Sequence, residues 1–137
     1  MELEKEMKTK KPIKRVYVAG PFNAGNVMDV LNNMREGISI CAGLMEMGMS
    51  PFCPWADHLF QLQENGKYLK IEDYYRYSID WLEVSDAMLV LPGYKTSKGT
   101  LAEIEFAKKH GIPIYYKSYE LIEAFINNEK TQGGNRR

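Results

Sequence analysis

The sequence has no apolar run long enough to cross a bilayer, and its first residues carry mixed charge instead of the apolar stretch of a secretory signal. We therefore expect a cytoplasmic protein with no membrane partner. Net charge is also absent, because eighteen basic residues balance eighteen acidic ones. A chain without a general positive field is not expected to bind nucleic acid, and any phosphate must be held by a local site.

Cysteine is scarce, with only Cys41 and Cys53 among 137 residues. The two cysteines do not form a metal-ligand spacing, and an intracellular protein would keep them reduced. We interpret both as packing residues. No metal and no cofactor is expected.

The length is typical of one domain with a single core. We expect residues 1–12 to form a flexible lead-in and residues 13–127 to form the domain. Residues 128–137 are expected to be a disordered tail, because this polar segment lacks the apolar residues that would offset its ordering entropy.

Within the domain, short β-prone runs alternate with segments in which apolar residues recur at helical spacing. The spacing predicts strands over 15–20, 49–53, 86–91 and 112–116, and helices over 27–47, 71–84, 100–110 and 119–126. Residues 55–63 fit a short helix or an ordered loop, and this middle part leaves room for a fifth strand. The order predicts an α/β fold: a doubly wound, Rossmann-like parallel sheet of four to five strands with helices on both faces.

Ligands of doubly wound sheets bind beyond the carboxyl ends of the strands. That rule points to residues 20–23, 51–58 and 92–103, which are rich in glycine, proline and polar side chains. The third segment leads into a helix start, where free backbone N–H groups and the helix dipole favour an anion such as a phosphate. The alternative is a tight turn that needs Gly99 only for its backbone.

Glu103 lies in the first turn of the helix that is expected to begin at Thr100, so its carboxylate can reach the mouth of the sheet and act as a nucleophile. Thr100 to Glu103 also fits a capping box, in which the glutamate bonds back to the cap residue. On spacing alone, the capping interpretation is the stronger one. Asp86 begins the third strand and is expected at the opposite end of the sheet, as a surface or capping carboxylate.

Three motifs carry a resemblance to a known family: Tyr17–Phe22, Asp80-Trp81 before Ser85-Asp86-Ala87, and Ser97–Ala107. Together they resemble the nucleoside 2-deoxyribosyltransferase family, which includes the 2′-deoxynucleoside 5′-monophosphate N-glycosidases and an uncharacterised phage and bacterial branch. In that family the pattern Ser-x-Gly-x-x-x-Glu carries the nucleophilic glutamate, which falls on Glu103. The resemblance implies a flavodoxin-like sheet and a homodimer or larger homo-oligomer.

The resemblance also implies the reaction. It is cleavage of the N-glycosidic bond of a (2′-deoxy)nucleoside or its 5′-monophosphate, by hydrolysis or base exchange. Glu103 is then the nucleophile, Asp80 the second carboxylate, and Tyr17 the residue that holds Glu103 by a hydrogen bond. The expected substrate-binding residues are Gly20, Pro21, Phe22, Trp55, His58, Gly93, Ser97, Lys98 and Gly99.

Within that set, Ser97 and the backbone of Lys98 and Gly99 would bind a 5′-phosphate. Phe22 or Trp55 would stack on the base, with ordinary core or rim packing as the alternative for each aromatic. His58 follows Trp55 closely, and a single histidine beside an aromatic is more often structural.

Two other functions stay open. A non-catalytic nucleotide-binding sensor or sequestering module would use the same loop without needing the carboxylate. A phosphoribohydrolase is the other alternative, because Pro92-Gly93 followed by Gly99-Thr100 and Glu103 loosely resembles the Pro-Gly-Gly-x-Gly-Thr-x-x-Glu motif of the cytokinin-activating enzymes, apart from an insertion between the glycines.

Overall fold

The structure is a computed structural model, and it describes residues 11–64 and 68–132. Four parallel strands form one sheet in the order β2-β1-β3-β4. The strands are β1 (Arg15–Ala19), β2 (Ser50–Phe52), β3 (Ala87–Val90) and β4 (Ile114–Tyr115). The helices are α2 (Val27–Glu46), the 3₁₀ helix η1 (Pro54–Leu62), α3 (Ile71–Glu83), the 3₁₀ turn η2 (Tyr94–Thr96), α4 (Lys98–Lys109) and α5 (Ser118–Gln132).

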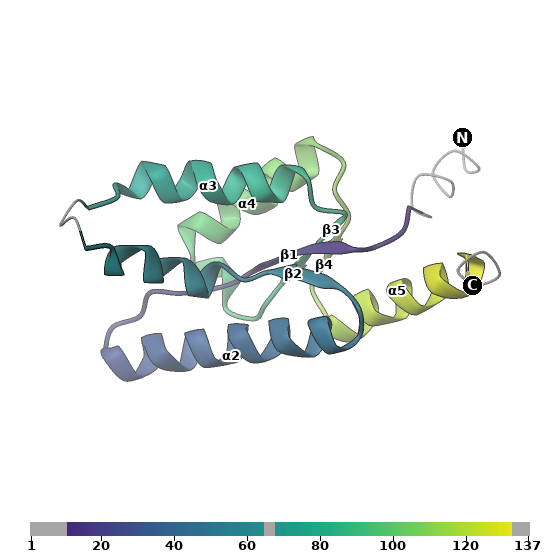
Figure 1. Cartoon of the computed structure of the whole chain (residues 1–137), viewed down its shortest axis with the longest axis horizontal. Coiled ribbons are helices and arrows are strands. Elements are labelled where there is room, and N and C mark those ends of the chain that lie inside the picture. Colours follow the sequence, from purple (N-terminus) through teal and green to yellow (C-terminus); the bar gives the residue numbers. More distant parts are fainter. Residues whose placement is uncertain (1–10, 65–67, 133–137) are drawn as a thin grey trace.

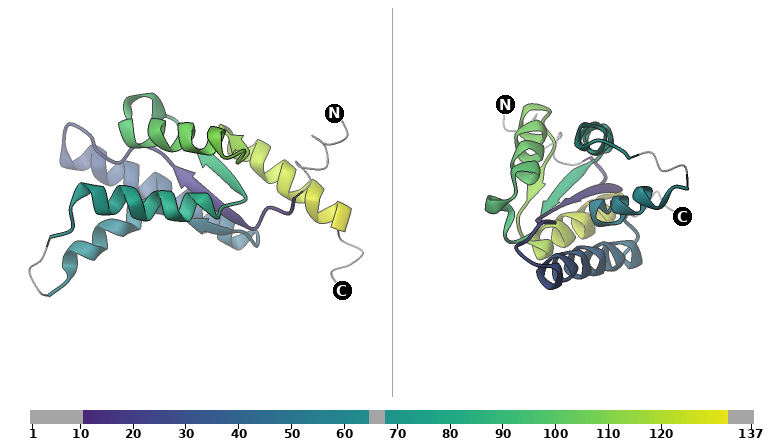
Figure 2. Two further views of the ribbon diagram at one scale, coloured as in Figure 1. Left: turned by 90° about the horizontal axis from the view of Figure 1, so that it is seen from above. Right: turned by 90° about the vertical axis from the view of Figure 1, so that its left-hand side faces the viewer.

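The strand β1 lies inside the sheet, and its side chains alternate between the two faces. Val16 and Val18 belong to a core that includes residues of α2 and α5. Tyr17 and Ala19 belong to a second core, which includes residues of α3 and α4. Figures 1 and 2 show the corresponding helical layers on opposite sides of the sheet. The predicted doubly wound parallel sheet, with helices on both faces, is confirmed.

Glycines mark the ends of two helices. Gly48 follows α2 and Gly111 follows α4, with φ angles of 102° and 67°. This left-handed backbone is strained for other residues and lets the chain leave a helix abruptly. Both helices therefore end where the sequence predicts.

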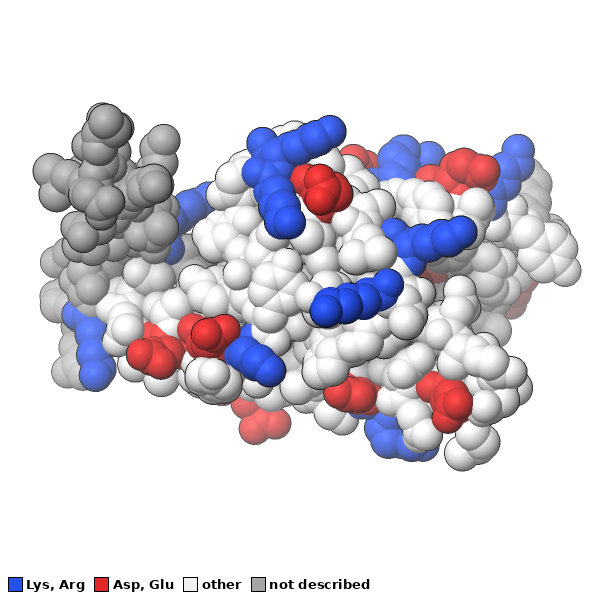
Figure 3. Space-filling model, turned by 180° about the vertical axis from the view of Figure 1, so that it is seen from behind, with Lys and Arg blue, Asp and Glu red and all other residues white. Residues whose placement is uncertain are grey.

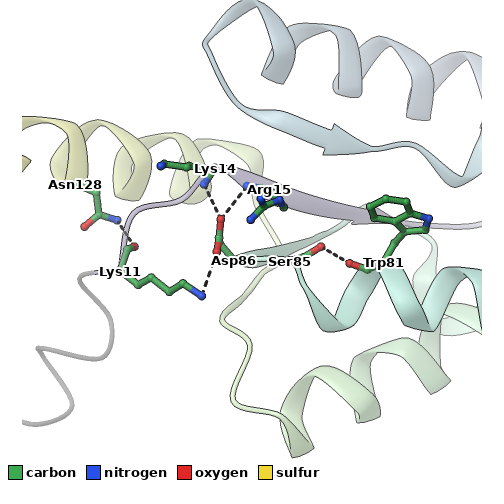
Figure 4. Close-up of polar contacts among 7 residues, drawn as sticks. All are labelled: Lys11, Lys14, Arg15, Trp81, Ser85, Asp86 and Asn128. Carbon is green, nitrogen blue, oxygen red and sulfur yellow. Dashed lines mark hydrogen bonds and ion pairs between the residues drawn. The ribbon is translucent and has the colours of Figure 1, made fainter. Parts of the chain in front are cut away.

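Asp86 anchors the beginning of β1, at the end of the sheet where the strands start (Figure 4). Its carboxylate accepts hydrogen bonds from the backbone N–H groups of Lys14 and Arg15, at 3.0 and 2.9 Å, and lies 3.2 Å from the Lys11 ammonium. Burial raises the pKa of Asp86, but these donors lower it more, so the pKa lies below its ordinary value. The predicted structural role of Asp86 is confirmed.

Residues 54–62 form η1, which agrees with the short helix expected there as one of two alternatives, and the sheet of the described residues has four strands, the lower of the predicted numbers. The C-terminal segment differs from the prediction. The last helix continues past Ile126 to Gln132, and the Asn128 amide donates to the Lys11 carbonyl at 3.5 Å. Residues 128–132 of the expected tail are therefore helical, since good helix formers such as Glu129 and Lys130 extend a helix already anchored by buried Leu121. Residues 133–137 of the tail and 1–10 of the lead-in lie outside the described residues.

Charges of both signs are scattered over the face shown in Figure 3, where Lys and Arg lie between Asp and Glu side chains. This distribution agrees with the zero formal net charge. Among residues 11–64 and 68–132, no helix has the length and apolar character needed to cross a membrane.

Trp55 joins η1 to the core below it. Its side chain is 1% exposed and lies against Gly37 of α2, where a Cβ atom would come within 2.3 Å of the indole ring. The absence of a side chain at Gly37 therefore determines how closely η1 approaches α2.

We expect Gly37→Ala to lower the free energy of unfolding by about 2 kcal/mol, because the new methyl group must displace the Trp55 ring. Gly43→Ala is the matched control on the same helix, since a Cβ there meets nothing within 4 Å. It should leave stability unchanged or raise it by about 1 kcal/mol through helix propensity. Urea denaturation measures both variants, and equal stabilities would contradict the tight packing.

Candidate active site

A cavity of about 650 Å³ opens at the carboxyl ends of β1 and β3. Four segments line it: the turn after β1, η1, residues 71–78 of α3, and the start of α4 with the residues just before it. These strands are neighbours, and β2 pairs with the other edge of β1, so the cavity lies at the topological switch point of the sheet. Its volume falls within the range of roughly 300–1,000 Å³ that is usual for small-molecule sites.

Most residues expected from the sequence meet in this cavity. Nine of them line it: Gly20, Pro21, Phe22, Trp55, His58, Ser97, Lys98, Gly99 and Glu103. Gly93 does not line it. Gly93 has a φ of 87° and packs against Pro21. A Cβ atom at position 93 would come within 3.2 Å of the proline ring.

Glu103 projects from α4 toward the central strand. The hydroxyl of Tyr17 donates a hydrogen bond to its Oε2 atom, as the sequence analysis expected. The helix begins at Lys98 and its cap is Ser97, whose hydroxyl accepts from the backbone N–H of Thr100 at 3.3 Å. Glu103 therefore lies in the second turn, and the capping-box interpretation, which needs Thr100 as the cap, is wrong.

The pKa of Glu103 is raised from its ordinary value of 4.5 to about 7. Burial is the main cause, because it removes water from the charged form. The hydrogen bond from Tyr17 lowers the pKa, and the nearby charge of Asp57 raises it. The carboxyl group thus changes its charge near neutral pH, as a group that takes part in a reaction often does.

Tyr17 is held firmly. Its ring is buried and stacks on Phe52, with ring centroids 5.1 Å apart. Burial raises the pKa of Tyr17 well above its ordinary value, the Glu103 charge raises it further, and a hydrogen bond with Ser78 lowers it. Tyr17 therefore remains a neutral hydroxyl and can serve as a fixed donor to Glu103.

Asp80 does not reach the cavity of its own chain. It is exposed on α3, whereas Ser78 of the same helix is buried and lines the cavity. Residues two apart on an α-helix point about 200° apart around the axis. Since Ser78 faces inward, Asp80 must face outward.

Side chains from distant parts of the sequence fix the turn after β1. The Trp55 indole N–H donates to the Pro21 carbonyl at 3.0 Å, and the Asn33 amide donates to the Phe22 carbonyl at 3.2 Å. The Thr100 hydroxyl lies 3.2 Å from the Gly20 carbonyl. These contacts hold the turn against the start of α4, so the two walls of the cavity have a fixed separation.

The two aromatic candidates differ in their surroundings. Trp55 is almost wholly buried and belongs to the core, which favours the packing interpretation, although it also forms part of the cavity wall. Phe22 is partly buried, and its ring centroid lies 6.1 Å from that of His58. His58 Nδ1 lies 2.8 Å from the Trp55 carbonyl and must donate to it, so neutral His58 has an unprotonated Nε2.

Sequence reasoning missed several residues of the cavity wall, and Asp57 is the most informative. It lies on η1, lines the cavity with Glu103, and has a pKa raised by burial and lowered by the charge of His58. The segment 54–62 carries no clear periodicity, so the sequence gives no direction for this side chain. Tyr74 and Ser78 were also missed, and their four-residue spacing on a helix was the available signal.

No group of three or more potential metal-ligating side chains occurs within the described ranges. Cys41 is buried, Cys53 is partly buried, and both are free thiols that pack in the core shared by α2 and α5.

The fold and the cavity define a doubly wound α/β domain with a partly buried carboxylate at its switch point. Residues 14–116 match the domain of unknown function DUF4406, and the chain belongs to that family. A search of curated proteins finds no match.

Two solved structures share the fold at low sequence identity. One is a 2-deoxyribosyltransferase from the psychrotolerant bacterium Bacillus psychrosaccharolyticus, described as a biocatalyst for nucleoside synthesis; identity is 18% and the TM-score 0.54, over 73% of this chain and 69% of that one. The other is the solution structure of BlsM, with 17% identity and a TM-score of 0.55, over 89% of this chain and 76% of that one. The resemblance to the 2-deoxyribosyltransferases is thus confirmed for the fold.

We expect Glu103→Gln to stabilise the protein at pH 8 by about 2 kcal/mol, because the neutral amide removes a partly desolvated charge. The folded carboxyl keeps its proton up to about pH 7, whereas an unfolded glutamate releases it near 4.5. The wild type should therefore gain stability as the pH falls through this window, and the advantage of the variant should shrink. Urea denaturation at several pH values measures both.

The control is Glu105→Gln, because Glu105 is exposed two residues further along α4. It should change stability little at any pH. An advantage of Glu103→Gln that stays constant from pH 8 to below 4.5 would contradict the raised pKa.

Proposed function

We propose that this protein cleaves the N-glycosidic bond of a (2′-deoxy)nucleoside or nucleoside 5′-monophosphate, with Glu103 as the nucleophile. The observation that carries the proposal is the placement of this carboxylate. It is partly buried, bonded to Tyr17, and directed into a cavity of nucleoside size at the switch point of the sheet. The fold shared with a 2-deoxyribosyltransferase supports the same class of substrate.

The proposed reaction is a double displacement. Ionised Glu103 attacks the anomeric carbon, the bond from that carbon to the base nitrogen breaks, and the base departs with the electron pair and a proton. Water or a second base then attacks the same carbon and frees the glutamate, so the configuration is retained. Tyr17 stabilises the ionised form of Glu103 beforehand, and the carboxylate in turn stabilises the cationic sugar of the transition state.

The start of α4, together with its cap residue Ser97, is the proposed phosphate site. Ser97, Lys98 and Gly99 line the cavity at the start of this helix, where backbone N–H groups and the helix dipole favour an anion. Gly99 has no positive φ, and a Cβ there meets nothing within 4 Å. The backbone therefore does not require glycine, and its absent side chain leaves room for a ligand.

We also infer that a second copy of the chain completes the site. Ile71 and Tyr75 line the cavity and yet are 60% and 52% exposed, so the cavity opens onto an apolar rim. Leu62 at the end of η1 is 76% exposed. Exposed apolar side chains at the rim of a site support a protein interface there. Analytical ultracentrifugation that finds only monomer would contradict this inference.

Incubation with a panel of nucleosides and 5′-monophosphates, with and without a second free base, tests the reaction. Release of base alone means hydrolysis, and its transfer to the second base means exchange. Glu103→Ala should lower the rate about a thousandfold or more, because no nucleophile remains. Glu105→Gln, on the exposed side of the same helix, should keep full activity.

If Glu103→Ala is as active as the wild type, the proposed mechanism is wrong. If no substrate reacts but a nucleotide binds equally well to the wild type and to Glu103→Gln, the protein is a binding module. Cleavage of ribosides in preference to deoxyribosides would favour the phosphoribohydrolase alternative.

Gly99→Val tests the phosphate site separately. We expect the fold to stay intact, because a side chain has open space there. The KM for a 5′-monophosphate should rise at least about tenfold, while that for the matching nucleoside changes less, since the new side chain fills the space of the phosphate. An equal loss with both substrates would show that the phosphate lies elsewhere.

A further inference from the structure

The cavity contains a second carboxylate that the motif resemblance does not identify. Asp57 of η1 lines the same cavity as Glu103 of α4, although the two belong to different elements of the chain. Asp80, the aspartate that the motifs favour, is exposed on the outer side of α3. Among the described residues, Asp57 and Glu103 are the only two carboxylates that line this cavity. A reaction that needs two carboxylates there would use this pair.

We propose that Asp57 is the catalytic acid that gives its proton to the departing base and later takes one from the attacking water. This inference rests on the proposed function. It adds the identity of the second carboxylate of the reaction, which it assigns to η1.

Several interactions link Asp57 to Glu103. The Asp57 charge raises the pKa of Glu103 and also that of Tyr17, so the carboxylates lie within electrostatic reach of each other. Burial raises the pKa of Asp57 itself. With a pKa of about 7, Glu103 keeps a proton below that pH in the free protein, in the cavity that it shares with Asp57. The free protein thus stores the proton that the reaction needs.

The reaction determines which member of the pair holds that proton. Tyr17 donates to Glu103 and favours its ionised form. The positive charge that develops on the sugar in the transition state favours ionised Glu103 further, so the proton is on Asp57 when the C–N bond breaks. The other ionisable side chains around the pair are His58 on η1, Tyr74 and Tyr75 on α3, Lys98 on α4, and Tyr17 on β1.

The other possible acids are less suited to this step. The Nδ1 proton of His58 is already donated to the Trp55 carbonyl and is therefore not available to the base. Lys98 is exposed to solvent at the start of α4, in the proposed phosphate site. Tyr17 is occupied by its hydrogen bond to Glu103.

The proton and electron balance is complete without another reactant. In the first step a Glu103 oxygen bonds to the anomeric carbon, the electron pair of the breaking C–N bond goes to the base, and the Asp57 proton goes to a base nitrogen. In the second step water bonds to the same carbon, its proton goes to Asp57, and the ester bond to Glu103 breaks. The sum is nucleoside plus water giving free sugar plus base.

The test compares Asp57→Asn with Asp80→Asn on two kinds of substrate. The first kind is an ordinary nucleoside or 5′-monophosphate that the wild type cleaves. The second has a base that leaves without a proton: an N7-methylated purine nucleoside, or 5-nitrouracil as the base if the enzyme prefers pyrimidines. Loss of a general acid slows only substrates whose base needs the proton.

We expect Asp57→Asn to lower kcat for the ordinary substrate about a hundredfold or more. For the substrate with the activated leaving group, kcat should fall by less than about tenfold. Wild-type activity on the ordinary substrate should fall above pH 7 as the stored proton is lost, and this decline should be absent from Asp57→Asn. Asp80→Asn should show no dependence on the leaving group. An equal loss with both substrates in Asp57→Asn, or a leaving-group effect only in Asp80→Asn, overturns the proposal.

A second readout needs no substrate. Carbon NMR of the carboxyl groups should show that the pKa of Glu103, about 7 in the wild type, is lower in Asp57→Asn. An unchanged pKa overturns the pairing. Failure of the proposed function looks different: the wild type then releases no base from any substrate, and the role of Asp57 falls with it. If the wild type releases base and Glu103→Ala does not, the proposed function stands. The results for Asp57→Asn then decide whether Asp57 is the catalytic acid.

Discussion

The candidate site depends on one hydrogen bond, from the hydroxyl of Tyr17 on the central strand to the carboxylate of Glu103 on α4. Tyr17 is buried and stacked on Phe52, so the donor cannot turn away. A carboxyl group in partly buried surroundings would otherwise keep its proton and lose its ability to attack. The neutral Tyr17 hydroxyl favours the ionised carboxylate without placing a positive charge in the site. A positively charged donor would repel the cationic sugar of the proposed transition state.

The alternating faces of β1 connect this bond to the fold. One set of its side chains packs toward α2 and α5, and the other set brings Tyr17 to the layer that contains α4. Because this alternation follows from the geometry of any strand, the core and the site arise from the same five residues of sequence. The positions of the strands, their parallel direction and the location of the candidate site at their carboxyl ends were therefore predictable. The glycines at 48 and 111 ended their helices as expected because they act through local backbone freedom.

The parts that could not be predicted depend on where a helix begins or how it is rotated. The capping interpretation of Glu103 failed because α4 begins two residues earlier than the spacing suggests, a shift within the usual uncertainty of helix ends. Asp80 was misplaced because the buried side of α3 includes Ser78, and only packing determines that rotation. Asp57 lies on a 3₁₀ helix without apolar periodicity, and the direction of its side chain depends on how Trp55 packs against Gly37 of α2.

Trp55 is both a core residue and part of the cavity wall, and it fits only because position 37 carries no side chain. The shape of the cavity in this family is then constrained by a pair of positions. A smaller residue at position 55 would enlarge the cavity but leave a void against α2. A larger residue at position 37 could fill that void, but only after Trp55 had been replaced by a smaller residue. We therefore expect the sizes of these two residues to covary among relatives, with glycine at 37 wherever tryptophan occupies 55.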